Sequence, residues 1–121
     1  MSFSTPDLSD ANPEVKALSP ILKNLGGKKA FWGKIETLQC PDDNSFVKEL
    51  FNSEGAGKVL VVDANGISSV ALLGDMIAEA GVKNDWSGIV INGYVRDIDV
   101  LSKLDIGVQA LGTIPVRSEK R

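Results

Sequence analysis

The sequence predicts a single α/β domain over residues 1–121, built on a largely parallel β-sheet. The chain has 121 residues, the length of one domain. Its 43% hydrophobic and 24% charged residues are typical of a globular protein. From residue 58 onward, strand-like apolar runs alternate with helical patterns. This alternation is typical of parallel strands joined by right-handed crossovers.

The first half of the chain is expected to contain a short helix, a strand and a second helix. Residues 4–7 combine a serine cap, a proline and an acid, which predicts a helix start. Residues 30–40 are predicted to form a strand, with Gly33 as a bulge or a point of close approach. Residues 45–51 place their large apolar side chains on one helical face: Phe46, Val47, Leu50 and Phe51.

The second half supplies the repeating strand and helix pattern. Residues 58–63 form a continuous apolar run, which predicts a strand buried on both faces. A helix is predicted over residues 68–83, a strand over 88–93, a short helix over 98–104 and a strand over 107–112.

Two residue counts exclude several kinds of chemistry. The chain has no histidine, which excludes Ser-His-Asp and Cys-His nucleophiles and histidine-ligated zinc or iron. The single cysteine, Cys40, can form neither an internal disulfide nor a thiolate cluster, and we expect a reducing, cytoplasmic location. Carboxylates, lysine, arginine, backbone amides and a metal that prefers oxygen ligands remain.

Charge and hydropathy narrow the choice of partners. The net charge of −3 and a pI near 4.9 argue against direct nucleic-acid binding. Runs of about 18 apolar residues are absent from the sequence, so we expect no membrane-spanning helix. Three basic residues near the end, Arg117, Lys120 and Arg121, are expected to form a solvated tail.

Ligands of parallel sheets bind beyond the carboxyl ends of the strands, which here are Asp63, residues 92–97 and the segment from Thr113 onward. Arg96-Asp97 is the sharpest signal, because an arginine fork matches a carboxylate and an aspartate can hold Mg²⁺. The alternative is that Asp97 only caps the helix over 98–104 and that Arg96 is a solvated charge.

The Gly74-Asp75 pair is a second candidate. Both residues weaken a helix interior, so their place inside residues 68–83 is unusual. They mark either a tolerated kink or the start of a helix. In the second case the free N–H groups of the first turn could bind a carboxylate.

Several blocks of the sequence together resemble the regulator of ribonuclease E activity A (RraA-like) family, whose enzyme members are 4-hydroxy-4-methyl-2-oxoglutarate aldolases. These blocks are residues 57–63, 71–75, 86–90, 92–97 and 105–113, in that order and spacing. The resemblance implies a three-layer β/β/α fold of the swivelling-domain type and homotrimers with the site at a subunit interface. It also implies that family members continue past residue 121, so this chain would be shortened at its C-terminus.

The resemblance further assigns roles to residues. The backbone of Gly74, Asp75, Met76 and Ile77 would bind the substrate carboxylate. Arg96 would hold the keto acid and act in catalysis, and Asp97 would anchor a divalent cation, expected to be Mg²⁺. The implied reaction is cleavage of 4-hydroxy-4-methyl-2-oxoglutarate to pyruvate, with oxaloacetate decarboxylation at the same site.

Two alternatives to an aldolase stay open at this stage. The first is a regulator without catalysis that binds and inhibits ribonuclease E. Family members of that kind lack the aspartate of the Arg-Asp pair, so Arg96-Asp97 favours the enzyme. The second is a methyltransferase, which nothing here supports because a glycine-rich S-adenosylmethionine loop is absent from the sequence.

Overall fold

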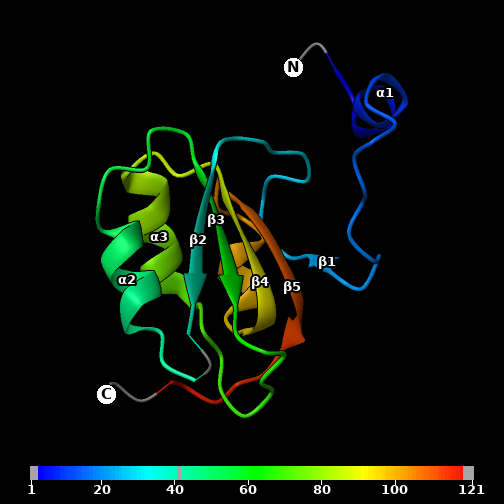
Figure 1. Ribbon diagram of the computed structural model, residues 1–121. Helices are drawn as coiled ribbons and strands as arrows, with labels where there is room; N and C mark the ends of the chain where they lie inside the picture. Colours follow the sequence, from blue (N-terminus) through cyan, green and yellow to red (C-terminus); the bar gives the residue numbers. More distant parts are fainter. Residues whose placement is uncertain (1–2, 41, 119–121) are drawn as a thin grey trace.

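The computed structural model describes residues 3–40 and 42–118, which form an α/β fold around one five-stranded sheet (Figure 1). The strand order is β1-β5-β4-β3-β2. Four strands run parallel, and β1 pairs antiparallel with β5 at the edge. The strands are β1 (Lys23–Asn24), β2 (Ile35–Gln39), β3 (Val59–Asp63), β4 (Gly88–Val95) and β5 (Gly107–Thr113). The predicted α/β class with a largely parallel sheet is therefore confirmed.

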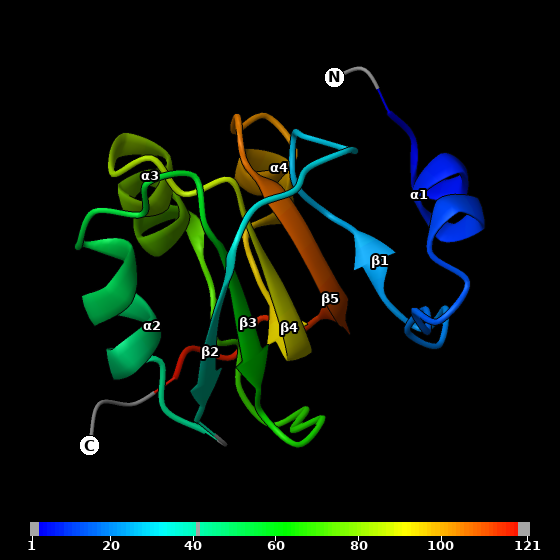
Figure 2. The same cartoon turned by 45° about the horizontal axis from the view of Figure 1, so that its top comes forward.

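Three helices cover one face of this sheet, and the N-terminal segment lies on the opposite side (Figures 1 and 2). The three helices are α2 (Ser45–Phe51), α3 (Asp75–Lys83) and α4 (Ile98–Leu101). A fourth helix, α1 (Thr5–Ala11), belongs to the N-terminal segment. Helices α2, α3 and α4 connect successive parallel strands, so right-handed crossovers place all three on the same face. Within the described residues, none of these helices combines the length and apolar character needed to span a bilayer.

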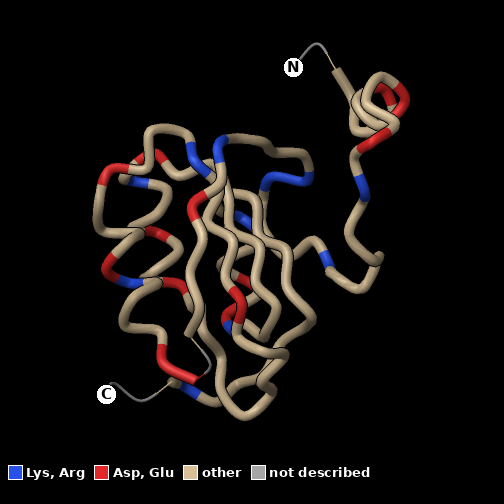
Figure 3. The backbone as a smooth tube through the Cα atoms, in the orientation of Figure 1, with Lys and Arg blue, Asp and Glu red and all other residues tan. Residues whose placement is uncertain are grey.

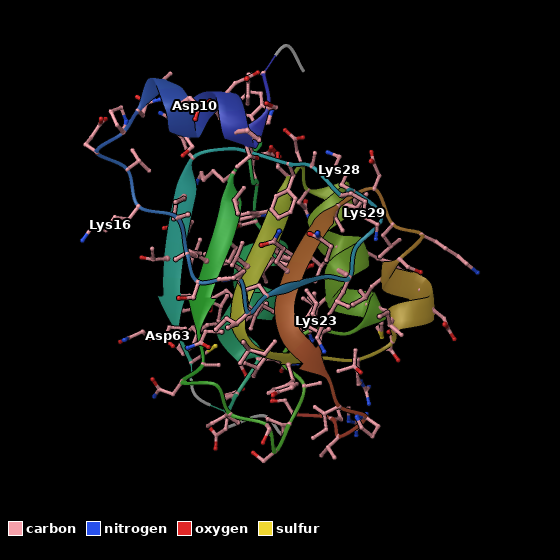
Figure 4. All side chains as sticks on the ribbon, turned by 90° about the vertical axis from the view of Figure 1, so that its right-hand side faces the viewer. Asp10, Lys16, Lys23, Lys28, Lys29 and Asp63 are labelled. Carbon is pink, nitrogen blue, oxygen red and sulfur yellow. The ribbon has the colours of Figure 1, made fainter. Side chains whose placement is uncertain are left out.

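Helix α1 stands apart from this packing. Figure 4 shows it with Asp10 above the sheet, and the segment that carries Lys16 passes in front of the strands. None of its residues is buried, although Ser4 caps it by accepting a hydrogen bond from the Asp7 amide at 3.3 Å. The predicted helix start at residues 4–7 is thus confirmed.

The helix predicted over residues 68–83 begins instead at Asp75, so the first part of that prediction is wrong. Gly74 is extended, with φ −132° and ψ −168°. Before it, the chain runs beside the end of β4, where the Leu72 amide donates to the Tyr94 carbonyl at 2.8 Å. The helix predicted over 98–104 is also too long, because α4 ends at Leu101.

The core lies between the sheet and the three helices. Its largest fully buried side chains come from both layers: Phe51, Leu60, Leu72, Leu73, Ile89, Ile91, Leu101 and Ile106. Helices α2 and α3 approach closely because residue 81 is glycine, where a Cβ would lie 2.5 Å from Phe51 Cδ2. Such contact density is what makes a core sensitive to a single added methyl group.

The opposite face of the sheet is only partly covered by the described residues. Ile35 of β2 is 67% exposed, and Val61, Val90 and Leu111 are half-buried. Figure 3 shows that the charged residues gather on the helices and connecting segments, with few on the strands. Beside this sheet, Ala71 forms single parallel bridges with Tyr94 and Arg117.

Cys40 follows β2 and is 4% exposed. Burial raises the pKa of its thiol to about 11, and the nearby carboxylates of Asp43 and Asp63 add to the shift. Only the thiolate reacts readily, so we predict alkylation by iodoacetamide at pH 8 roughly 100-fold slower than for a free thiol. Full reactivity should return in guanidinium chloride; a fast reaction in the native state would contradict the burial.

The same shift predicts how stability depends on pH. The pKa of Cys40 in the native state lies above the ordinary thiol value of 9.0 that applies to the unfolded chain. The native state therefore binds the proton more tightly than the unfolded state. This contribution to stability is complete below pH 9 and is lost as the pH rises toward 11. We expect a Cys40→Ser variant to show a smaller loss of Tm than the wild type across that range.

Candidate functional site

A cavity of about 520 Å³ opens at the edge of the sheet where the parallel strands end. The segments that follow the four parallel strands all contribute residues to the wall of this cavity. These lining residues are Asn44, Lys48, Ala71, Leu73, Gly74, Asp75, Met76, Ile77, Arg96, Arg117 and Ser118. In Figure 1 this is the lower edge, where the arrowheads point and the C-terminal segment runs toward α2. Ligands of parallel α/β sheets bind at this edge.

The first turn of α3 faces this cavity. Gly74 is the capping residue and brings no side-chain cap. Two of the first amides bind carboxylates of the chain itself: that of Asp75 donates to Asp97 Oδ2 at 3.1 Å and that of Met76 to Asp75 Oδ1 at 2.8 Å. The amides of Gly74 and Ile77 have no hydrogen-bond partner among the described residues. A helix start with free N–H groups is suited to an anion.

Asp97 is the N-cap residue of α4, and its carbonyl accepts hydrogen bonds from the Val100 and Leu101 amides, but its side chain does not cap the helix. Its backbone is left-handed, with φ 60° and ψ 42°, a conformation that aspartate tolerates better than most residues. Its side chain makes no capping bond to α4 and turns instead toward α3. The side chain is 35% exposed, and a Cβ on Gly74 would lie 2.9 Å from Asp97 Oδ2. Asp97 is not itself among the residues that line the cavity, but its carboxylate lies beside Gly74, which is.

Arg96 is held at the end of β4 by its backbone and its side chain. Its amide donates to the Leu73 carbonyl at 2.9 Å, and its Nη1 donates to the Pro115 carbonyl at 3.4 Å. Its Nε lies 3.7 Å from Asp97 Oδ2. At one-third exposure such an ion pair adds only about 0–1 kcal/mol to stability. The guanidinium is thus positioned at the cavity without being a major structural element.

A divalent cation fits the donors that are present. No group of three cysteine and acidic side chains gathers into a metal site in the part of the chain that the structure describes. Mg²⁺ does not require one, since it is commonly held by one or two carboxylates and completed by water and substrate oxygens. Asp97 Oδ2 is fixed by the Asp75 amide, and this kind of outer contact orients a metal ligand.

Asp63, at the end of β3, binds neighbouring polar groups and does not line the cavity. Its Oδ1 accepts hydrogen bonds from the Asn65 amide at 2.9 Å and from Asn92 Nδ2 at 3.0 Å. These bonds lower the pKa of its carboxyl. Asp63 is not among the residues that line the cavity, so it serves the turn after β3.

The sequence reasoning missed the part of the cavity wall formed by Asn44, Lys48, Arg117 and Ser118. Arg117 was expected in a solvated tail; it is exposed, as expected, but its backbone pairs with Ala71 and it lines the cavity. The Ala71 amide donates to the Val116 carbonyl at 2.8 Å, which fixes the segment against the cavity. The other two basic residues of the expected tail, Lys120 and Arg121, lie outside the described residues.

The fold and the cavity define an α/β protein whose cavity, beyond the ends of the parallel strands, is lined by basic side chains and the first turn of a helix. The chain belongs to the RraA-like family, whose model, described as aldolase/RraA, matches residues 5–121.

Proteins that are similar to this chain in sequence are named as aldolases. A Pseudomonas syringae pv. tomato protein named "putative 4-hydroxy-4-methyl-2-oxoglutarate aldolase" is 55% identical over 122 residues, covering 100% of this chain and 75% of the relative. A protein of the same name from Pseudomonas aeruginosa (strain PAO1) is 51% identical over 122 residues, with the same coverage.

Solved structures show the same fold under two other titles. The RNA-processing inhibitor RraA from Thermus thermophilis (as its title spells it) superimposes with a TM-score of 0.92 at 39% identity, covering 99% of this chain and 73% of that one. A Geobacillus kaustophilus structure titled S-adenosylmethionine: 2-dimethylmenaquinone methyltransferase gives a TM-score of 0.88 at 37% identity, with coverage of 98% and 74%.

Proposed function

We propose that this protein is a carbon–carbon lyase that cleaves 4-hydroxy-4-methyl-2-oxoglutarate to pyruvate and also decarboxylates oxaloacetate, with Mg²⁺ as its cofactor. The observation that carries the proposal is the position of Arg96 and Asp97 against the first turn of α3, beside one cavity. The aldolase names of relatives at about half identity support it. The buried thiol of Cys40 fits a cytoplasmic location.

Arg96 and the first turn of α3 would bind the C1 carboxylate and the C2 carbonyl of the substrate. The guanidinium offers N–H groups in a fixed fork, which matches a carboxylate in two parallel bonds. The amides of Gly74 and Ile77 add donors from a rigid helix start. Both groups are held in place before the substrate arrives, so little reorganisation is needed when charge develops.

The reaction needs stabilisation of negative charge. Breaking the C3–C4 bond leaves its electron pair on the pyruvate fragment as an enolate, while the C4 hydroxyl loses its proton and becomes the carbonyl of the second pyruvate. The enolate then takes up a proton at C3 to give the first pyruvate, so the proton lost from the hydroxyl is balanced. When bound, Mg²⁺ supplies positive charge against this enolate as a Lewis acid. Asp97 would hold the cation, and Arg96 would place a second positive charge on the substrate side. Oxaloacetate gives the same enolate when its C4 carboxylate leaves as CO₂.

The direct test is pyruvate release, followed with lactate dehydrogenase and NADH, from both substrates in the presence of Mg²⁺. We expect turnover by the wild type, loss with excess EDTA and recovery when Mg²⁺ is restored. The Asp97→Ala variant is the matched background. Wild-type pyruvate release no faster than this variant would defeat the proposal.

Gly74→Ala should disturb the site without unfolding the protein. The extended backbone of Gly74 accepts alanine, so we expect nearly unchanged Tm. The new Cβ would lie 2.9 Å from Asp97 Oδ2 and 3.5 Å from Arg96 Nε, and must displace them. Misplacement of reacting groups by 1 Å can cost about 100-fold, and we predict a loss of kcat/KM of that order. Wild-type kinetics for this variant would show that Asp97 can sit elsewhere.

We also propose that the chain assembles as a homotrimer with the site near a subunit interface. The half-covered sheet face, with Ile35 exposed and Val61 half-buried, offers apolar surface for such contacts. Light scattering should then give three times 12.9 kDa. A monomer at micromolar concentration would contradict this part of the proposal.

A second candidate function is binding and inhibition of a ribonuclease without catalysis. The observation that favours it is the close superposition on the RNA-processing inhibitor RraA. The two functions are separated by one pair of measurements: inhibition of ribonuclease E with an RNA substrate, and pyruvate release by the same preparation. Inhibition without keto-acid turnover would favour the regulator.

A further inference from the structure

We infer that the chain has a second ligand site, a pocket that binds a single aromatic ring carrying a carboxylate. The pocket lies between α1 and the segment before β2, and residues 3, 5, 8, 29–32 and 109 line it. We call it the aromatic pocket. None of these residues lines the cavity of the proposed lyase, so the inference does not depend on the proposed function.

The aromatic pocket lies at the amino ends of the parallel strands. The Phe31 ring packs against the first residues of β4 and β5, where a Cβ added at Gly88 or Gly107 would collide with it. These two glycines therefore allow the ring to reach the surface of the sheet. Figure 1 shows the segment before β2 at the top of the sheet, away from the arrowheads. The two sites are thus at opposite ends of the sheet.

Three aromatic side chains line the pocket: Phe3, Phe31 and Trp32. The rings of Phe3 and Trp32 meet edge to face, with centroids 5.7 Å apart and an angle of 62° between their planes. Trp32 is 63% exposed, so part of its indole is open to a ligand. Aromatic rings favour offset-stacked and edge-to-face contacts with one another. These walls therefore match a flat ring better than an aliphatic chain.

The charge of the pocket predicts an anionic group on the ligand. Lys29 is the one charged residue among the described lining residues. Its Nζ donates a hydrogen bond to the Gly26 carbonyl at 2.9 Å, which holds the ammonium group in place. This bond uses one of the three N–H groups of an ammonium. The others can donate to a carboxylate, and such charge-assisted hydrogen bonds are strong.

The volume of the pocket limits the size of the ring system. The aromatic pocket has a volume of about 180 Å³. An apolar cavity of about 150 Å³ is large enough for benzene, so this pocket has room for one six-membered ring and little more. Benzoate is the simplest compound that combines such a ring with a carboxylate, and it is therefore the probe of choice.

The deciding experiment titrates benzoate into isotope-labelled protein and follows the indole N–H signals of the two tryptophans by NMR. Trp86 is 3% exposed and its Nε1 donates to the Ser53 carbonyl at 3.0 Å, so its signal is the internal control. We expect the Trp32 signal to shift with a Kd of about 1 mM and the Trp86 signal to stay in place. Benzamide lacks the charge and cyclohexanecarboxylate lacks the aromatic ring, and each should bind about 10-fold more weakly.

Three variants make this result specific, with the Tm of each as the check on its fold. Lys29→Gln should weaken benzoate binding about 10-fold. Lys103→Gln removes an equal charge from an exposed position outside the pocket and should keep the wild-type affinity. Arg96→Ala removes a competing carboxylate site and should leave the Trp32 shift unchanged. An unshifted Trp32 signal, equal affinity for benzoate and either analogue, or full affinity of Lys29→Gln would overturn the inference.

Discussion

Asp97→Asn is expected to abolish most pyruvate release while leaving the fold intact. The amide is isosteric with the carboxylate and can still accept the hydrogen bond from the Asp75 amide. It removes the negative charge that would hold a divalent cation. A metal's charge is worth several kcal/mol in such a transition state, so we expect kcat/KM to fall ~100-fold or more, the equivalent of about 3 kcal/mol.

The stability of the variant is the control for this prediction. Asp97 is partly exposed and its ion pair with Arg96 is long, so the Tm should change little. A matched substitution at an exposed acid away from the cavity, Asp7→Asn in the first turn of α1, should leave pyruvate release at the wild-type rate. Full activity of Asp97→Asn would show that the charge of Asp97 is not needed.

Arg96→Lys should reduce kcat/KM by about 10- to 100-fold although it keeps the positive charge. Lysine is a point charge on a flexible stem and cannot reproduce the planar fork. It would also lose the contact from Nη1 to the Pro115 carbonyl, which helps to fix the side chain. Charge-assisted hydrogen bonds of this kind are worth about 1.5–3 kcal/mol each.

The measurement for Arg96 is steady-state pyruvate release with both substrates. Arg96→Ala should lose more activity than Arg96→Lys, because it removes the charge as well as the fork. Since the side chain is one-third exposed, neither variant should lower the Tm by much. Equal activity of the lysine variant and the wild type would mean that a simple positive charge is sufficient.

Apolar patterns in the sequence correctly predicted the helices and strands whose ends are set by their own residues. Helix α2 occupies residues 45–51 as expected, because its apolar residues recur at helical spacing and Val47 and Phe51 are buried. The strands β3, β4 and β5 follow the continuous apolar runs. Arg96 and Asp97 stood out for a similar reason: two charged residues come directly after a buried strand.

The start of helix α3 was harder to predict, because buried residues in a helix and in an extended segment can give the same apolar pattern. Leu72 and Leu73 are fully buried, as a helical period requires, yet they lie in an extended stretch beside β4. Apolar spacing shows that residues are buried, but it cannot distinguish a helix from an extended segment. The signal that marked the true start was chemical: Gly74 and Asp75 are poor inside a helix and favourable at its beginning.

Arg117 could not be placed from local sequence at all. The residues after it in the sequence are polar and charged, which is typical of a tail. Its position at the cavity depends on contacts between distant parts of the chain: Ala71 pairs with Arg117, and the Asn44 amide donates to Oγ of Ser118, 74 residues away. Pairings over such distances are visible only in the folded protein. The exception is the general rule that ligands gather beyond the ends of parallel strands, which pointed to the segment after β5.

The most direct test of the central claim is a crystal structure of the protein soaked with Mg²⁺ and pyruvate. We predict a cation with an oxygen of Asp97 at about 2.0–2.1 Å, water molecules around it and the pyruvate carboxylate within hydrogen-bond distance of Arg96 and the first turn of α3. Well-ordered pyruvate elsewhere, with Asp97 bound only to the Asp75 amide and no cation beside it, would contradict the account.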